Sequence, residues 1–193
     1  MSASMPMTGF AGVAMRRWGN GALKHTLRGL LRRVRILRTI PAMSHLTFDT
    51  PTGPFTVTEE DGAIIRAEWE TGGSDETPLL IKARTQLIEY FDGTRDSFDL
   101  PLRVHGTDFQ RAVCDAMLTI PLGDTLTYGD IAKMLNVPAQ AVGQACGGNP
   151  IPVIIPCHRV MGAGGKLTGF SGRGGVETKV WLLRHERAAG LLI

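Results

Sequence analysis

Residues 127–148, TYGDIAKMLNVPAQAVGQACGG, decide the fold of the second half of this chain. Thr127 is a favoured N-cap residue, and the pattern that follows predicts a helix from Tyr128 to Leu135. Asn136-Val137-Pro138 predicts a tight turn, and a second helix is expected from Ala139 to about Cys146, ended by two glycines. A helix, a short turn and a helix outline a helix-turn-helix motif. On these residues alone, an ordinary helical hairpin is the commoner alternative.

A thiol, an imidazole and a guanidinium follow one another a few residues later, in Ile155 to Val160, IPCHRV. The apolar run Ile151 to Ile155 predicts a short buried strand, which Pro156 ends because proline supplies no N–H to a strand ladder. Cys157 is therefore expected where the chain turns out of the core. The thiolate is the reactive form of cysteine, and a nearby cation or helix N-terminus lowers the thiol pKa. The alternative is that Cys157 is a small buried hydrophobe.

Sequence neighbours on a strand point to opposite faces, so Cys157 and His158 would not meet if the strand continued. Contact between the thiol and the imidazole requires a turn or helix start at this point, or a bridging water. Pro156 favours such a turn.

The first half of the chain predicts a small α/β domain that ends near Val104. Alternating apolar and polar residues over residues 46–69 predict hairpins, and Asp61-Gly62 is a strong turn signal between two of the strands. Apolar residues at helical spacing predict a helix from Leu79 to Phe91, with Gly93 placed to end it.

Two further helices are expected in the second half. The first runs from Asp108 to Leu118, and Cys114 within it is interpreted as a packing residue. The second runs from Val180 to Ala189. On spacing alone, Glu186 would be a solvated charge on this second helix.

The composition is that of an ordinary globular protein. The 193 residues are 43% hydrophobic, and no stretch approaches the roughly 20 apolar residues of a membrane span. Three cysteines, without a CxxC pair, argue against a disulfide framework and a zinc finger. A reduced intracellular compartment is therefore expected.

The positive charge is concentrated in an N-terminal arm. Eight of the 21 Lys and Arg residues precede Asp49, before which there is no Asp or Glu, and the remaining 13 face 18 acidic residues. The net charge of +3 therefore does not indicate a basic DNA-binding face. Residues 1–43 have three interpretations: a phosphate-binding arm, a targeting segment, or a stretch that is not translated because synthesis starts at Met43. The last is favoured, and Leu27 to Leu37 has the pattern of a basic helix.

The segment IPCHRV and its surroundings resemble the active-site segment of the O(6)-alkylguanine-DNA alkyltransferases, also called methylated-DNA–protein-cysteine methyltransferases. The resemblance spans roughly residues 45–190, and several motifs in the right order make it specific. These motifs are Asn149-Pro150, Gly169-Phe170-Ser171-Gly172, Gly106-Thr107-Asp108-Phe109-Gln110, Thr127-Tyr128-Gly129, Ala141-Val142-Gly143 and Trp181-Leu182-Leu183-Arg184-His185-Glu186.

The resemblance implies an α/β (α+β) fold with two domains. Residues 44–104 would form a small ribonuclease-H-like domain with antiparallel hairpins. Residues 105–193 would form a mostly helical winged helix-turn-helix domain that binds DNA and carries the active site. Residues 1–43 would be a basic extension, disordered or not translated.

The implied activity is DNA repair by a single-turnover enzyme. The alkyl group of O(6)-alkylguanine, and of O(4)-alkylthymine, would pass irreversibly from DNA to Cys157. The expected partner is double-stranded DNA containing alkylated guanine, bound through its minor groove with the damaged nucleotide flipped out. No cofactor, no metal and no membrane are expected, and the protein is expected to be a cytoplasmic monomer.

Residue roles follow from the matching motifs. Cys157 would be the nucleophile, His158 its base through a water, and Glu186 the carboxylate that orients the imidazole. Asn149 would brace the active-site turn, and Tyr128 would donate a proton as charge develops on the leaving guanine. The residues placed at the substrate are Ser171, which would donate to the guanine oxygen, Phe170 and Pro152 as facing walls, Val160, and Arg159, which would hold the loop and favour the thiolate.

The helix expected at residues 139–146 is implied to be the DNA recognition helix. Its small residues Ala139, Ala141 and Gly143 allow close approach to a groove. Gln140 departs from the family, which has an arginine there that fills the space of the flipped nucleotide. Two rival hypotheses are a module that binds lesions without repairing them, against which Cys157 argues, and a cysteine hydrolase with a Cys-His-Glu triad, for which no oxyanion hole is marked.

Overall fold

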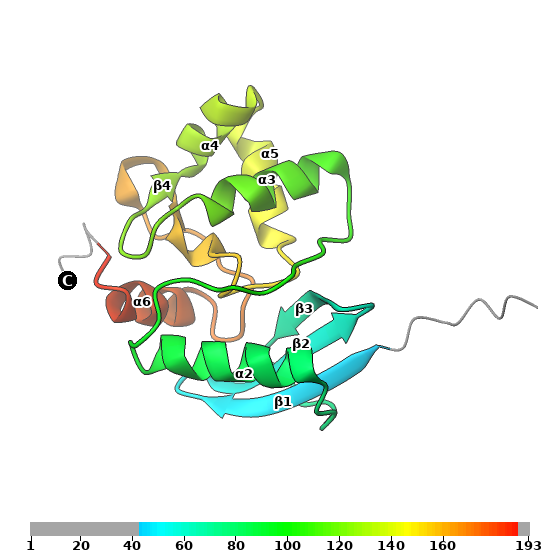
Figure 1. Cartoon of the computed structure of the whole chain (residues 1–193). Coiled ribbons are helices and arrows are strands. Elements are labelled where there is room, and N and C mark those ends of the chain that lie inside the picture. Colours follow the sequence, from blue (N-terminus) through cyan, green and yellow to red (C-terminus); the bar gives the residue numbers. More distant parts are fainter. Residues whose placement is uncertain (1–42, 189–193) are drawn as a thin grey trace, which may run out of the picture. The chain divides into compact units, whose positions relative to one another are not determined.

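The computed structural model describes residues 43–188, which begin with a three-stranded antiparallel sheet (Figure 1). Its strands lie in the order β1 (Ser44–Thr50), β2 (Gly53–Glu60) and β3 (Ala63–Glu68). Asp61 and Gly62 join β2 to β3 with φ angles of +46° and +73°, as a tight Asp-Gly hairpin turn requires. The hairpins predicted over residues 46–69 are confirmed.

Helix α2 (Pro78–Phe91) packs against β1 and β2 and covers the sheet. The Thr77 hydroxyl caps it by accepting a hydrogen bond from the Leu80 N–H at 3.1 Å, an arrangement worth about 1 kcal/mol. Leu80, Ala83 and Leu87 recur at helical spacing and are fully buried. The apolar face of the amphipathic helix is therefore the face that packs against the sheet. The predicted helix is confirmed.

The segment after α2 runs along β3 before the chain enters its second half. The Ile64 N–H donates to the Pro101 carbonyl at 2.8 Å, and the Arg103 N–H donates to the Ile64 carbonyl at 2.9 Å. These bonds pair the edge of β3, which would otherwise present unpaired backbone groups.

The second half is mostly helical and contains α3 (Asp108–Leu118), α4 (Tyr128–Leu135) and α5 (Ala139–Gly147). A capping box starts α4: the Thr127 hydroxyl accepts from the Asp130 N–H at 3.1 Å, and the Asp130 carboxylate accepts from the Thr127 N–H at 2.9 Å. Asn136 ends α4 in the left-handed conformation, with φ +54°. The predicted helix, tight turn and helix are confirmed.

The strand predicted over Ile151–Ile155 is wrong. These residues are buried, but they form a compact turn in which the Ile155 N–H donates to the Ile151 carbonyl at 2.9 Å. Val153 adopts φ +73°, a conformation that a β-branched residue takes only under constraint. A short apolar run predicts burial but does not determine the backbone conformation, so the sequence pattern was correct only about the burial.

Helix α6 (Val176–His185) is displaced from its predicted range of 180–189. It begins four residues earlier, and Glu186 is its C-cap residue rather than part of its interior. Between α5 and α6 lie the 3₁₀ helix η2 (Cys157–Arg159), the strand β5 (Val160–Met161) and the 3₁₀ helix η3 (Ala163–Gly165). Strand β5 pairs in parallel with β4 (Leu126–Thr127), which joins the segment after η2 to the start of α4.

The described residues therefore form a mixed α/β protein, with an antiparallel sheet and one helix first and a helical part after it. No helix within residues 43–188 has the length and apolar character needed to cross a membrane. The basic arm, and the helix predicted at residues 27–37, lie outside the described part of the chain.

Candidate active site

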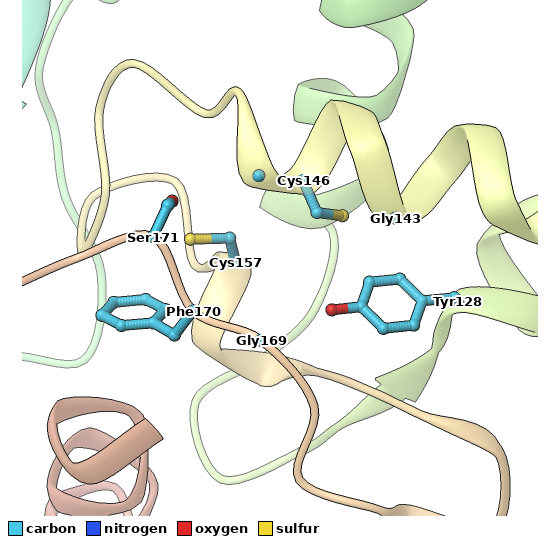
Figure 2. A pocket seen from close by; sticks show the side chains of 8 residues that line it. Tyr128, Gly143, Cys146, Cys157, Gly169, Phe170 and Ser171 are labelled. Carbon is cyan, nitrogen blue, oxygen red and sulfur yellow. The ribbon is translucent and has the colours of Figure 1, made fainter. Parts of the chain in front are cut away.

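Cys157 begins η2 and lies at the wall of a cavity of about 290 Å³. The chain turns at Pro156, as the sequence predicts, and the Cys157 N–H donates to the Ile155 carbonyl at 2.9 Å. Only 6% of Cys157 is exposed. Figure 2 shows the cavity, whose lining residues are Tyr128, Gly143, Cys146, Gly147, Cys157, Gly169, Phe170 and Ser171.

Asn149 holds the buried turn that leads to Cys157. Its side-chain NH₂ donates to the Ile155 carbonyl at 2.8 Å, and its side-chain oxygen accepts from the Ile151 N–H at 3.0 Å. Both backbone groups belong to the turn that contains the strained Val153, so the asparagine side chain supplies hydrogen bonds that a strand would have made. The bracing role predicted for Asn149 is consistent with this geometry.

His158, which follows Cys157 in η2, forms a fully buried pair with Glu186. His158 Nε2 lies 2.8 Å from Glu186 Oε1. A carboxylate can only accept, so Nε2 carries the proton, and in the neutral ring Nδ1 keeps its lone pair. Among the described residues, His158 Nδ1 is the single fully buried side-chain nitrogen or oxygen without a hydrogen-bond partner. The imidazole therefore presents a free basic nitrogen within the core.

Arg159 fixes the carboxylate of Glu186 from a second side. Its Nε donates to Oε2 at 2.8 Å and a terminal nitrogen donates to Oε1 at 3.0 Å, the two-pronged geometry that suits a carboxylate. The other terminal nitrogen donates to the Ile120 carbonyl at 2.5 Å. The guanidinium is thus engaged by Glu186 and the backbone, and its position supports the loop-holding part of the role expected for Arg159.

The pKa values in this cluster have identifiable causes. Burial alone would raise the pKa of Glu186, but the hydrogen bonds from His158 and Arg159, with the positive charge of Arg159, outweigh it and lower the pKa to about 2. Burial lowers the pKa of His158 below its ordinary value, against the opposing influence of Glu186. At neutral pH the pair is therefore a neutral imidazole beside an ionised carboxylate, which is the state that a base requires.

Burial raises the pKa of the Cys157 thiol. The hydrogen bond from Asn149 and the charge of Lys179 oppose that rise. The thiol is therefore protonated in the resting protein, and an adjacent base is needed to convert it to the thiolate.

Two buried residues of this neighbourhood were not recognised from the sequence. Lys179 is fully buried, and its Nζ donates to the Val160 carbonyl at 2.6 Å and to the Thr168 carbonyl at 3.1 Å. Tyr90 donates its hydroxyl to Glu186 Oε1 at 2.6 Å. A signal for Lys179 was present, because it precedes the buried Leu182 and Leu183 by three and four residues and so shares their helix face. No local signal marked Tyr90.

The cavity brings together some of the predicted substrate-contacting residues and leaves out others. Tyr128, Phe170 and Ser171 line it together with Cys157. Pro152 instead lines a neighbouring cavity of about 820 Å³, which shares Gly147 and Ser171 with the first. Val160 and Arg159 are buried and contribute no side chain to the walls of the first cavity.

The loop that carries Phe170 rests on the N-terminal sheet. The Phe170 ring lies edge-on to Trp69, with ring centroids 5.7 Å apart, and Trp69 in turn packs edge-on against Phe55 at 4.9 Å. A Cβ on Gly172 would lie 2.3 Å from the Phe170 ring and 2.6 Å from Trp69, so only glycine allows this packing. The aromatic wall of the cavity is therefore held by the first half of the chain.

Helix α5 forms part of the cavity wall. Gly143 lines the cavity, whereas Ala139 and Gln140 are exposed at the start of the helix and Ala141 is half-buried. The helix accordingly presents one face to the cavity, and its first turn is exposed to solvent.

A cysteine at a cavity wall, followed in the chain by a histidine whose imidazole pairs with a buried carboxylate, defines the class of this site. Two family models match the chain: the 6-O-methylguanine DNA methyltransferase ribonuclease-like domain over residues 43–104, and the DNA binding domain of the same family over residues 108–188. The chain belongs to the 6-O-methylguanine DNA methyltransferase family.

Individual relatives agree with this assignment. The methylated-DNA–protein-cysteine methyltransferase of Mycobacterium tuberculosis H37Rv is 42% identical over 152 residues, which are 74% of this chain and 91% of that protein. The constitutive enzyme of that name from Bacillus subtilis 168 is 40% identical over 157 residues, covering 74% and 94%. The crystal structure of the Mycobacterium tuberculosis O6-methylguanine methyltransferase matches with a TM-score of 0.69 at 40% identity, covering 76% of this chain and 93% of that one.

A second crystal structure of the Mycobacterium tuberculosis protein is a complex with DNA. It matches with a TM-score of 0.68 at 42% identity and covers 75% of this chain and 92% of that one.

Proposed function

We propose that this protein is a single-turnover DNA repair enzyme that transfers the alkyl group of O(6)-alkylguanine to Cys157, with O(4)-alkylthymine as a second substrate. The observation that carries the proposal is the position of the thiol. Cys157 lines a cavity of about 290 Å³, and the next residue in the chain is His158, whose imidazole forms a buried pair with Glu186. The names of the relatives support the same activity.

The first step activates the thiol. His158 Nδ1 is a buried lone pair without a protein partner, and a water molecule between it and the Cys157 thiol would satisfy both groups. The thiol proton passes through this water to Nδ1. Glu186 stabilises the imidazolium that results, because its ionised carboxylate already accepts a hydrogen bond from the Nε2–H of His158.

The second step is a direct displacement. The Cys157 sulfur attacks the alkyl carbon, the new S–C bond forms as the bond between that carbon and the guanine oxygen breaks, and the electron pair remains on the guanine. Tyr128 donates a proton to the leaving guanine and is reprotonated from the imidazolium, so the net proton transfer is from thiol to guanine. Burial raises the pKa of Tyr128, which keeps its hydroxyl protonated before the reaction. The thioether product has no good leaving group, so each molecule acts once.

The cavity walls suit a flat base. Phe170 offers an aromatic face held by Trp69, and Ser171 at the same wall offers a donor to the guanine oxygen. Pro152 would act from the neighbouring cavity, and the buried Val160 would act through its backbone, whose carbonyl accepts a hydrogen bond from Lys179.

The proposed partner is double-stranded DNA that contains alkylated guanine, bound through its minor groove by α5. The target atom lies inside the base stack, so the damaged nucleotide must leave the duplex to reach the cavity. The small residues Ala139, Ala141 and Gly143 allow close approach of α5, and Gln140, exposed in its first turn, would occupy the vacated space. The match to a relative solved in complex with DNA supports DNA as the partner.

The proposal also covers the organisation of the chain. We propose a catalytic and DNA-binding domain over residues 105–193, an N-terminal domain over residues 44–104, and an extension over residues 1–43 that the activity does not need. A monomer suits attack on a single flipped base. The free thiols Cys114, Cys146 and Cys157 favour a reduced, cytoplasmic compartment.

Stoichiometry tests the activity. With an excess of duplex carrying labelled O(6)-methylguanine, label should move to the protein until one methyl is bound per molecule, and transfer should then stop. A hydrolase with the same three side chains would release its product and turn over repeatedly. More than one methyl removed per protein molecule therefore contradicts the proposal.

Replacing Gln140 by arginine tests the role of α5. Flipping costs a few kcal/mol of unpairing and unstacking, and a longer, charged side chain at residue 140 would offset more of it. Q140R should therefore repair duplex substrate roughly tenfold faster, the effect of ~1.4 kcal/mol on a barrier. Its reaction with free benzylguanine, which needs no flipping, should be unchanged.

The control for this variant is Q144R, which adds the same charge one turn later on the exposed side of α5. If the repair rate on duplex substrate rises equally in Q140R and Q144R, the effect is general electrostatic attraction. If Q140R also gains on benzylguanine, residue 140 acts on the thiol chemistry and the interpretation fails.

A further inference from the structure

We propose that Tyr90, a residue of the N-terminal domain, is a positioning residue of the active site that sets the proton affinity of His158 through Glu186. The inference rests on the proposed alkyl transfer for its kinetic consequence. Its structural basis, a hydrogen bond that crosses from α2 to the residue ending α6, is independent of the substrate.

Glu186 Oε1 accepts three hydrogen bonds at once. They come from His158 Nε2 at 2.8 Å, the Tyr90 hydroxyl at 2.6 Å and a terminal nitrogen of Arg159 at 3.0 Å. Tyr90 is 1% exposed and Glu186 is 3% exposed, so water does not compete for this oxygen. The Tyr90 hydroxyl must donate here, because a carboxylate has no proton to give.

A second contact fixes the tyrosine relative to α6. The side chain of His185 reaches the Tyr90 carbonyl at 2.7 Å and lies edge-on to the Tyr90 ring, with centroids 5.2 Å apart. His185 also stacks on Trp181 at 5.1 Å, and Trp181 packs against Phe91 at 6.0 Å. The backbone and the ring of Tyr90 are therefore held independently of its hydroxyl.

The hydroxyl competes with His158 for the same oxygen. Each donor withdraws negative charge from Oε1. The hydrogen bond from Tyr90 therefore weakens the hydrogen bond that Glu186 accepts from the imidazole N–H. Arg159 holds the carboxylate in place by two prongs whether or not Tyr90 donates. The contribution of the hydroxyl is consequently to tune the basicity of His158, while the position of Glu186 is secured elsewhere.

The other charged and titratable groups around the pair are accounted for. Arg159 from η2 and Lys179 from α6 both act to lower the pKa of His158, and burial acts in the same direction and most strongly. Cys157 lies next to His158 in η2, and His185 faces the Tyr90 backbone. Tyr90 is the donor on Glu186 that comes from the N-terminal domain. This gives that domain a direct effect on the proton transfer.

The test removes the hydroxyl, or makes it a stronger donor, with little change in the size of the ring. In Y90F the Glu186 carboxylate stabilises the protonated form of His158 more strongly. The pH of half-maximal rate with free benzylguanine should therefore rise by about half a unit, so that the reaction on the acid side is roughly threefold slower. Site-specific 3-fluorotyrosine at residue 90 is a stronger donor and should shift the profile the opposite way. The Nε2–H proton resonance of His158 should move downfield in the first variant and upfield in the second.

The matched control is W181F, which loosens the packing between α2 and α6 but does not touch Glu186. It should lower the free energy of unfolding and leave the pH profile unchanged. Profiles and resonances that stay at their wild-type positions in both Tyr90 variants would overturn the proposal and leave Tyr90 as a packing residue. The resonance measurement needs no substrate. It therefore decides the role of Tyr90 even if neither the wild type nor any variant reacts with benzylguanine.

Discussion

The variant C157S should lose alkyl transfer by at least about 10³-fold while it keeps its fold and its affinity for duplex DNA. Serine is nearly the same size and fits the site of a residue that is 6% exposed, so little packing is lost. A hydroxyl is a far weaker nucleophile than a thiolate, and the His158–Glu186 pair cannot compensate for that difference. The measurement is the rate at which label leaves a methylated duplex, together with a binding titration and an unfolding curve.

The control for C157S is C146S, because Cys146 lines the same cavity. Burial raises the pKa of Cys146 to about 12, so its thiol is not expected to act as a nucleophile, and C146S should retain transfer. Transfer that persists in C157S, or that disappears equally in both variants, would mean that the nucleophile has been assigned to the wrong residue.

Of the variants described, E186Q should lose the most stability, and its alkyl transfer should also be slow. Removing the charge leaves Arg159 buried without a counter-ion, which costs about 3 kcal/mol, and the imidazolium loses its stabilising partner. We expect transfer to slow on the order of 100-fold. The control is E177Q, an exposed carboxylate in the first turn of the same helix, whose loss should cost under ~1 kcal/mol.

The stability difference between wild type and E186Q should depend on pH in a defined direction. The pKa of Glu186 is lowered from 4.5 to about 2 in the folded protein, so its contribution is fully present above about pH 4.5 and is lost as the pH falls toward 2. Denaturant unfolding at neutral pH and at about pH 3 measures this. A difference between the two proteins that stays constant over that range would show that the ionised carboxylate is not the source of the stability.

Local chemistry in the sequence was sufficient for much of the fold. The Asp61-Gly62 turn predicted a hairpin because both positions tolerate positive φ, and Thr127 predicted the start of α4 because its hydroxyl replaces a missing backbone partner. Pro156 similarly marked the turn that exposes Cys157 to the cavity. In each case one residue type meets a requirement that its immediate neighbours create.

What the sequence could not predict depends on distant partners. The run Ile151–Ile155 is buried as expected, but the Asn149 side chain takes up its backbone groups and permits a turn in place of a strand. Spacing alone predicts that Glu186 is a solvated charge. In the structure it is buried, because Arg159, His158 and Tyr90 all donate hydrogen bonds to it. Tyr90 is 96 residues away from Glu186, and no local pattern records such a contact.

The most direct test of the account is the location of the transferred group. The protein should be incubated with a duplex that contains O(6)-methylguanine, digested, and its peptides measured by mass. We predict one added methyl per molecule, on the peptide with Cys157, and unmodified peptides for Cys114 and Cys146. A methyl on either of those two cysteines, or repair of the duplex without any methylated peptide, would contradict the account.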